Sequence, residues 1–274
     1  CYEASCGYGA LYDQLAKIAH RIVVAHPGHL RLIYQAKKKN DRVDARKLAT
    51  LLYVDAVPTV HVPKQDVRSW RQLIEFRRHA VEKRSGVKNA IQSLLKSHGI
   101  DKPQDLRSYW TKKGRAWLGA IEWPTSSAQF QSEMLLEELD QANDRVRRLT
   151  KQLDQIADRD PRVILLKTIP GVGVRTAEAI VAYIDDPNRF QKNKQVASYF
   201  GLTPSQDESA DVSRFGHITK QGPPTARKLL TEAAWQGICR DQTLRAYFER
   251  IADGKKDRRK IALIATAHYL VRVM

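Results

Sequence analysis

Apolar residues first recur at helical spacing near the start of the chain, at Leu11, Leu15 and Ile18. A spacing of three to four predicts an amphipathic helix over residues 11–20. The β-branched run at residues 22–25 then predicts a strand. Because the first residues of the chain also read as the end of a strand, the order is strand, helix, strand, which predicts a parallel α/β sheet.

A second helical pattern is much longer and runs from Lys64 to about Ile100, with an apolar stripe along a basic helix. Arginine is more frequent than lysine on its polar side. The guanidinium fork matches phosphate oxygens with two bonds, so we favour phosphate contact, with an ordinary solvated face as the alternative. The candidate nucleic-acid-binding residues of this helix are Arg77, Arg78, Arg84 and Lys88.

A third apolar pattern alternates spacings of four and three. It consists of Leu135, Leu139, Ala142, Val146, Leu149, Leu153 and Ile156. Such a heptad seam, with charged residues outside it and Asp160-Pro161 at its end, predicts a coiled coil. The seam can close within the chain as a helical hairpin. No second heptad segment accompanies it, so we favour self-association into a homo-oligomer.

The pattern of residues 163–184 predicts an apolar helix, a turn at Pro170–Gly173 and a second helix. This order is typical of a helix-hairpin-helix DNA-binding element. Glycine lets backbone N–H groups approach a phosphate, and the helix N-terminus adds partial positive charge. Gly171, Gly173 and Arg175 are therefore candidate nucleic-acid-binding residues, and an ordinary tight helical turn is the alternative.

Composition adds the class of partner. The 274 residues carry 47 Lys and Arg against 30 Asp and Glu, a net charge of +17. This excess indicates nucleic acid, with a cationic surface kept for solubility as the alternative. No apolar run approaches the ~20 residues that span a bilayer, so we expect no membrane partner. The 3 cysteines form neither an even disulfide set nor a metal knuckle, which favours a reducing cytoplasm.

Two aspartates, Asp41 and Asp44, open a predicted helix that follows a basic run at Lys37–Lys39. A spacing of three places both carboxylates on one helix face. Together with Glu3, at the end of the first strand, they are candidates for a Mg²⁺ or Mn²⁺ site that holds the metal against a phosphodiester. Helix capping and a favourable interaction with the helix dipole are the alternative roles of the aspartates.

Five blocks of the chain together resemble the insertion-sequence transposases with an acidic DEDD tetrad, whose members include the RNA-guided bridge recombinases. The blocks are Glu3–Tyr8, Asn40–Arg46, Ile169–Gly173, Tyr199–Pro204, and Gly216–Gly222 with Ala233–Trp235. Their order and spacing extend over nearly the whole chain, which makes the resemblance specific.

The resemblance implies a fold in three parts. These are a RuvC-like, RNase H-type α/β domain with the long basic helix at residues 1–100, a linker and coiled coil at 101–160, and a mainly α-helical transposase domain with the helix-hairpin-helix at 161–274. Glu3, Asp41 and Asp44 fall on the second, third and fourth acids of the tetrad, as metal ligands and catalytic groups. The first acid is expected upstream of Cys1, in a segment missing from an N-terminally truncated chain.

The resemblance also implies a serine nucleophile between the block ending at Pro204 and the block beginning at Gly216. Ser205, Ser209 and Ser213 lie in this polar, loop-like stretch, and counting from both blocks assigns Ser209 to the family position. A serine hydroxyl needs a metal or a base before it can attack phosphorus. The nearby candidates for holding the scissile phosphate or a guide strand are Arg214, Lys220 and Arg227.

Motifs and resemblance together predict a Mg²⁺-dependent DNA transposase or recombinase that forms a covalent phosphoserine intermediate. We expect it in the cytoplasm, associated with the nucleoid when bound to DNA. The resemblance adds a structured guide RNA as a candidate partner, which would select the target by base pairing. A structure-specific endonuclease that uses water and a non-enzymatic architectural DNA binder are the alternative functions.

Overall fold

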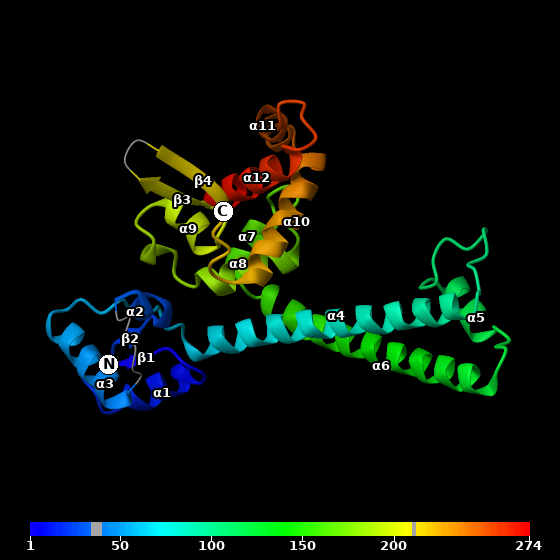
Figure 1. Cartoon of the computed structure of the whole chain (residues 1–274), viewed down its shortest axis with the longest axis horizontal. Helices are drawn as coiled ribbons and strands as arrows, with labels where there is room; N and C mark the ends of the chain where they lie inside the picture. Colours follow the sequence, from blue (N-terminus) through cyan, green and yellow to red (C-terminus); the bar gives the residue numbers. More distant parts are fainter. Residues whose placement is uncertain (34–39, 210–211) are drawn as a thin grey trace. The chain divides into compact units, whose positions relative to one another are not determined.

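The computed structural model has two compact units (Figure 1). The described residues are 1–33, 40–209 and 212–274, and the units are Cys1–Ser69 and Trp70–Met274. The predicted basic run Lys37–Lys39 lies outside the described residues. The boundary at Ser69 falls inside the long basic helix, and Arg68, in the first turn of this helix, pairs with Asp13 of the same unit.

The first unit contains two short parallel strands joined by a helix. β1 (Tyr2–Glu3) pairs with β2 (Val24–Ala25), with Glu3 opposite Ala25. α1 (Tyr8–Leu15) connects them and begins directly after Gly7, whose φ of +79° glycine adopts without strain. The predicted order of strand, helix and parallel strand is therefore confirmed, with the helix a few residues earlier than the pattern indicated.

Ala25 lies at the centre of the small core of this unit. It is fully buried and packs with Leu30 of α2 (Pro27–Ile33) and Leu51 of α3 (Asp41–Tyr53). It also forms an antiparallel bridge with Thr59, so β2 is hydrogen-bonded along both of its edges. The RuvC-like, RNase H-type fold of this unit stays a prediction.

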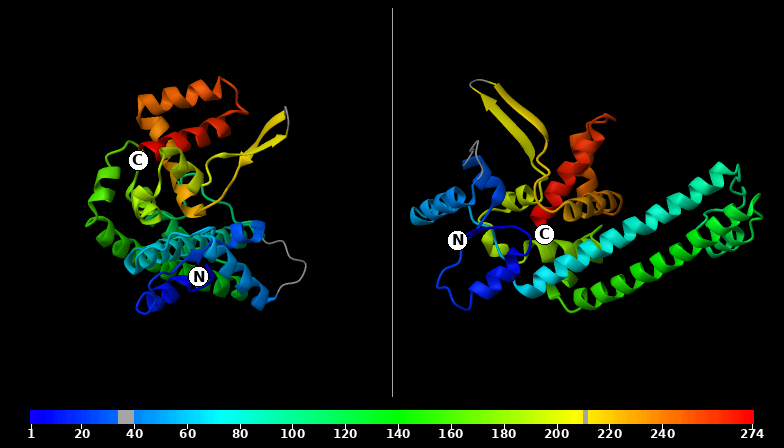
Figure 2. Two further views of the ribbon diagram at one scale, coloured as in Figure 1. Left: turned by 90° about the vertical axis from the view of Figure 1, so that its left-hand side faces the viewer. Right: turned by 60° about the horizontal axis from the view of Figure 1, so that its bottom comes forward.

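Two long helices begin the second unit and form an antiparallel hairpin (Figures 1 and 2). The two long helices are α4 (Gln65–Ser97), which belongs to this unit from Trp70 onward, and α6 (Ser126–Ala157). The short helix α5 (Lys112–Gly119) lies between them in sequence. Leu139 and Leu153, from the predicted heptad seam of α6, are almost completely buried, together with Ile91 and Ile74 of α4. The seam is thus covered within the chain by a helical hairpin, which was the alternative to self-association. Self-association stays a prediction and would need another surface.

A helical domain completes the second unit and confirms the expected mainly α-helical C-terminal part. Its elements are α7 (Pro161–Leu166), α8 (Val174–Ile184), the 3₁₀ turn η1 (Pro187–Arg189), α9 (Asn193–Tyr199), β3 (Pro204–Ser209), β4 (Val212–Ile218), α10 (Pro224–Arg240), α11 (Gln242–Ala252) and α12 (Arg259–Val273). Helix α8 is buried at every residue from Thr176 to Tyr183, because it is apolar almost all round and α6, α7 and α10 pack against it. None of the helices in the described ranges is both long and apolar enough to cross a membrane.

The stretch expected to be a polar loop around Ser209 is instead a two-stranded antiparallel ribbon. β3 and β4 pair with Ser209 opposite Val212 and Asp207 opposite Arg214, and the register is irregular only between Pro204 and Gln206. The loop prediction is wrong because β3 is polar and, among the described residues, its sheet contains only β3 and β4, so β3 lacks the apolar alternation of a half-buried strand. Figure 2 shows the ribbon extending away from the helices of this unit.

Candidate functional site

The two candidate aspartates of the first unit lie in the first turn of α3. The helix is capped by Asn40, whose side-chain oxygen accepts a hydrogen bond from the Arg42 N–H at 3.0 Å. Asp41 is therefore not the cap, contrary to the alternative role that its position indicated. Asp44 lies one turn from Lys47, with 3.9 Å between its Oδ1 and the lysine Nζ.

Glu3, the third candidate ligand, is exposed at the end of β1. Carboxylate oxygens are the donors that Mg²⁺ prefers. However, no three His, Cys, Asp or Glu residues in the described parts of the chain are grouped so that they could hold a metal ion. Glu3, Asp41 and Asp44 thus have suitable chemistry for a divalent cation but do not form a closed site in this structure.

Ser209 is the last residue of β3, and its register partner is Val212. Arg214 lies two residues beyond Val212 on β4 and is exposed. Because positions alternate between the two faces of a ribbon, this even separation assigns Arg214 and Ser209 to register positions on the same face. Among the predicted phosphate-binding residues, Arg214 therefore has the position best suited to act with Ser209.

The base of the ribbon is held tightly to the helical domain. Two glycines at this base, Gly201 and Gly222, have φ values of +64° and +71° and lie close to neighbouring backbone. A Cβ on Gly201 would collide with the backbone of Gln221, and a Cβ on Gly222 would collide with the backbone of Tyr199. Arg227 Nη1 donates to the carbonyl oxygens of Phe200, at 3.0 Å, and Gln221, at 2.8 Å. Arg227 thus clamps the base of the ribbon, a structural role that the sequence did not predict.

Lys220 lies at the exit of the ribbon with a φ of +54°. Its amide donates to the carbonyl oxygen of Gly201 at 3.3 Å, and its residue is exposed. The side chain therefore extends from a backbone position that the contact with Gly201 fixes. The exposed Lys220 is compatible with the predicted contact with a phosphate.

The predicted helix-hairpin-helix turn connects α7 with α8, and its two glycines have different surroundings. At Gly171, with φ +89°, a Cβ would lie 2.6 Å from the Ala233 carbonyl oxygen of α10, so this glycine permits close packing of the turn on that helix. Gly173 is the N-cap of α8, is exposed, and would have open space around a Cβ. Only Gly173 leaves room for a phosphate beside the helix N-terminus.

Arg175, the third candidate of this element, is engaged in a largely buried ionic cluster. Its Nη1 lies 3.0 Å from Glu178 Oε1, and it also pairs with Asp154 of α6. The Glu178 side chain is only 2% exposed, and burial raises the pKa of this carboxyl to about 7, although Arg175 and Arg77 favour its charged form. Arg175 therefore joins α8 to α6 rather than facing solvent.

The predicted basic face of α4 is largely used for contacts inside the second unit. Arg77 Nε donates to Thr150 Oγ1 of α6 at 2.8 Å, and Arg78 donates to Glu75 at 2.7 Å and to Glu82 at 2.6 Å. Lys88 Nζ lies 4.8 Å from the centre of a Trp110 ring, and Arg84 Nε is buried. The buried Arg84 Nε has no hydrogen-bond partner among the described residues. Phosphate contact stays a prediction, which the internal contacts of Arg77, Arg78 and Lys88 do not favour.

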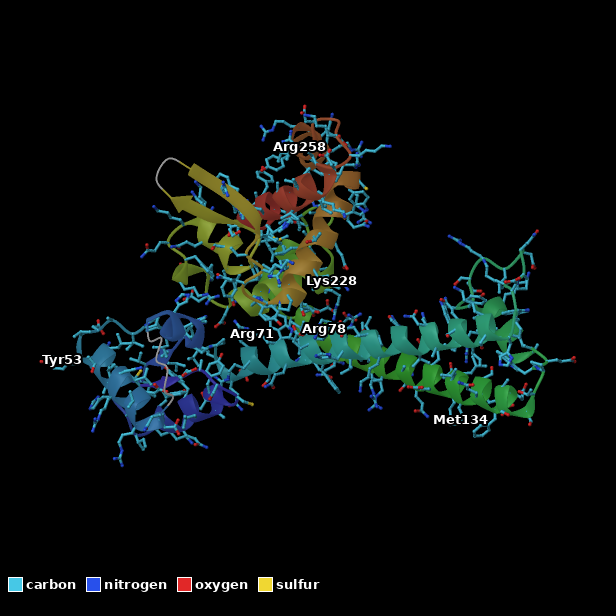
Figure 3. The ribbon with its side chains drawn as sticks, in the orientation of Figure 1. Tyr53, Arg71, Arg78, Met134, Lys228 and Arg258 are labelled. Atoms are coloured by element: carbon cyan, nitrogen blue, oxygen red, sulfur yellow. The ribbon has the colours of Figure 1, made fainter. Side chains whose placement is uncertain are left out.

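Arg71 is a further residue with a defined role that the sequence did not reveal. From α4 it donates to the carbonyl oxygens of Ala182, at 2.7 Å, and Tyr183, at 3.0 Å, near the C-terminus of α8 (Figure 3). The Tyr183 hydroxyl in turn donates to Glu75 Oε1 at 2.6 Å. Cations are favoured at helix C-termini, so this contact fixes α4 on α8. Its partners lie more than 100 residues away in sequence, where no local pattern could indicate them.

Two family models match the chain. A transposase model of the DEDD type of IS110 matches residues 2–100, and the transposase IS116/IS110/IS902 family matches residues 164–249. The first match includes Glu3, Asp41 and Asp44, and the second includes the glycine turn and the ribbon that carries Ser209. The resemblance seen in the sequence blocks is thereby confirmed.

Curated relatives carry the same description. A putative transposase (y4qE) of Sinorhizobium fredii is 27% identical over 86% of this chain and 57% of its own length. A probable family 20 transposase of Pseudomonas aeruginosa is 25% identical over 81% and 65%, respectively. The transposase for insertion sequence element IS1111A of Coxiella burnetii is 25% identical over 76% and 57%. The chain thus spans between 57% and 65% of the length of these relatives.

Proposed function

We propose that the chain, whose residues 2–100 and 164–249 match transposase models of the IS110 type, cuts and rejoins DNA strands with Ser209 as the nucleophile. The observation that carries the proposal is the ribbon of β3 and β4. Strand β3 of the ribbon ends at Ser209, and the register position of Arg214 on β4 lies on the same face as that of Ser209. Arg227 holds the base of the ribbon through hydrogen bonds to two carbonyl oxygens. A nucleophile is effective when its support holds it in one geometry.

In the proposed reaction, the scissile phosphate is transferred from its leaving strand to Ser209 and then from Ser209 to the hydroxyl of another strand. Ser209 Oγ forms a bond to the scissile phosphorus, the bond from phosphorus to the leaving strand breaks, and the serine proton is finally transferred to the leaving oxygen. One strand end is then held as a phosphoserine and the other carries a hydroxyl. Attack by a hydroxyl of another strand reverses these steps, so rejoining needs no external energy source.

Positive charge near Ser209 would hold the phosphate. Arg214 is proposed to pair with the non-bridging oxygens, because a guanidinium offers two parallel donors to a phosphate. Lys220 is proposed to supply a second positive charge at the exit of the ribbon, where it is exposed. The glycine turn at Gly173 is proposed to contact a neighbouring phosphate through the N-terminus of α8, which is open to solvent.

A divalent cation is the proposed cofactor, since the model that matches residues 2–100 is of the acidic DEDD type and carboxylate oxygens are the donors that Mg²⁺ prefers. Glu3, Asp41 and Asp44 are the donors that this chain would offer, and a bound Mg²⁺ or Mn²⁺ would neutralise charge on the attacked phosphate. A structured guide RNA and assembly into a homo-oligomer are proposed as further partners of the whole protein. The seam on α6 is already covered by α4, so oligomerisation would use another surface.

The covalent intermediate provides the test. The natural full-length protein is incubated with labelled DNA and Mg²⁺, and protein-bound DNA is detected after denaturation. We expect an adduct in the wild type and in Ser213→Ala, a serine of the same ribbon, and none in Ser209→Ala. Strand cleavage with no adduct in any variant would support the water-using endonuclease instead. DNA binding without cleavage, unchanged by Asp41→Asn and Asp44→Asn, would support the architectural alternative.

A further inference from the structure

Phe215 is a large aromatic residue that the ribbon exposes to solvent. It lies in the middle of β4 opposite Gln206 and is 69% exposed. No ring pair or cation–π contact that includes it occurs among the residues the structure describes. A single exposed apolar residue is ordinary on a protein surface, so exposure alone assigns no role.

The charged residues around Phe215 indicate which class of ligand could stack on its ring. Arg214 precedes it, and His217 and Lys220 follow it, all exposed on β4 and its exit. In the two described strands the acidic residues, Asp207 and Glu208, belong to β3, and the basic residues Arg214 and His217 belong to β4. Aromatic rings among cationic residues are the combination with which proteins bind single-stranded nucleic acid, because each base has a face that can stack and each phosphate needs a counter-charge.

The ribbon also provides a rigid support for such a ring. The clamp of Arg227 on the carbonyl oxygens of Phe200 and Gln221 holds the base of the ribbon, and the Thr219 amide donates to the Thr203 carbonyl oxygen at 2.9 Å. A ring on an ordered strand loses little conformational freedom when it binds. Stacking on Phe215 would therefore retain most of its favourable free energy.

Register relates Phe215 to the nucleophile. It lies three residues from Val212, the partner of Ser209, which corresponds to about 10 Å along a strand. An odd separation assigns the two positions to opposite faces of the ribbon. A DNA strand that has its phosphate at Ser209 must therefore pass the ribbon edge to reach the ring. Only a base that has left its pair and its stack can follow this path.

We propose that Phe215 is a stacking platform for an unpaired base of the DNA strand that Ser209 attacks. The inference rests on the proposed function and deepens it, because it assigns an unpaired DNA strand as the substrate form at this ribbon. Arg214 and Lys220 hold the flanking phosphates, and the ring holds the base that separates from the duplex. The ring takes no part in bond making, so its contribution is to affinity and to positioning of the strand.

Binding to single-stranded DNA tests the platform directly. The full chain is titrated with a labelled single strand, with a duplex of the same sequence, and with an RNA strand of that sequence. We expect Phe215→Ala and Phe215→Leu to weaken binding of the DNA strand about tenfold, and Phe215→Trp to retain it, because stacking needs an aromatic face. Phe130→Ala is the matched control, since Phe130 on α6 is 64% exposed and is expected to have no effect.

A spectroscopic readout separates stacking from other contacts. A single strand that contains 2-aminopurine should lose fluorescence on binding to the wild type and to Phe215→Trp, but much less on binding to Phe215→Leu. Ser209→Ala should bind and quench as the wild type does. If the phosphoserine adduct is never observed but quenching depends on Phe215, the proposed reaction fails and the platform stands.

Several results would overturn the platform. Unchanged affinity of Phe215→Ala for the single strand would do so, as would full binding by Phe215→Leu or an equal loss for single strand and duplex. An effect confined to the RNA strand would assign the ring to RNA instead. If Phe215→Ala changed only the oligomeric state in light scattering, the ring would belong to a protein interface.

Discussion

At the scale of single residues, Glu178 is a carboxylic acid that the fold buries almost completely. It is 1% exposed, its Oε1 pairs with Arg175, and its Oε2 has no hydrogen-bond partner among the residues described. Burial penalises the charged form and raises its pKa to about 7, against an ordinary value of 4.5. The native chain thus keeps this proton over a pH range in which the unfolded chain releases it.

We predict that stability falls as pH rises from about 4.5 to about 7. Below this window both states hold the proton, so the contribution of Glu178 is complete; above it, the folded state must hold a buried charge. The contribution is on the order of 3 kcal/mol. Thermal unfolding between pH 5 and pH 8 should show a decline in the wild type that is reduced in Glu178→Gln. His268, whose pKa burial lowers, acts in the opposite direction but equally in both proteins. Parallel pH profiles would contradict the prediction.

Gly171 illustrates how one residue type can have two explanations. The motif indicates a glycine that lets a backbone N–H approach a phosphate. The structure gives it a steric role, because a Cβ would meet the backbone of Ala233 and Gly237 on α10. Gly173, two residues later, has open space around it, so for this glycine the role predicted for both stays a prediction.

At the scale of elements, α6 depends on α4 for the cover of its apolar seam. Leu139 is 1% exposed in a cluster with Ile91 and Leu95, whereas Met134, five residues earlier on the same helix, is 48% exposed. Two long antiparallel helices bury such a seam without a second chain, as in other helical bundles. The hairpin therefore explains the heptad pattern without self-association.

We predict that Leu139→Ala lowers the free energy of unfolding by about 2–5 kcal/mol, because it leaves a cavity between the helices. Met134→Ala, a comparable truncation at an exposed site, should change it by less than about 1 kcal/mol. Chemical denaturation of both variants provides the measurement. If Leu139→Ala instead dissociated an oligomer and left the fold of each chain intact, the seam would be an interface between copies.

At the scale of the whole molecule, the net charge of +17 is divided between internal and external roles. Arg71, Arg77, Arg78 and Arg175 all bond to partners within the second unit. Arg71 connects α4 with α8, Arg77 connects α4 with α6, and Arg175 connects α8 with α6. Arg78 bonds to Glu75 and Glu82 of its own helix α4. The charge available to the proposed DNA partner is therefore smaller than the composition indicates, and Arg214 on β4 is one charge that is exposed.

The salt dependence of DNA binding distinguishes the two kinds of arginine. Each phosphate contact adds about 0.9 to the slope of log affinity against log salt for duplex DNA. We predict that Arg214→Ala lowers this slope by about that amount, and that Arg78→Ala leaves it unchanged because Glu75 and Glu82 already hold Arg78. Filter binding over a range of salt concentrations measures both. An equal fall for Arg78→Ala would restore the basic helix as a DNA contact.

Much of the architecture could be predicted from local patterns. The parallel strands around α1, the long helices α4 and α6, and the turn between α7 and α8 all follow from periodicity and from turn residues. The β3 and β4 ribbon could not, since Pro204–Ser209 is polar and poor in strand-forming residues. Its strands exist because each satisfies the backbone of the other and tight glycine contacts at Gly201 and Gly222 fix their base.

The sequence by itself determined the resemblance to IS110-type transposases, the order of helices and turns, and the residue types that are candidates for chemistry, because these depend on neighbours along the chain. Only the tertiary structure decided which of those residues are engaged elsewhere. Arg175 pairs with Asp154, Gly171 packs on α10, and the seam of α6 packs on α4, each through a partner distant in sequence. Periodicity indicates that an apolar face must be covered, and charge indicates that a group needs a partner. The tertiary structure determines which residue is that partner.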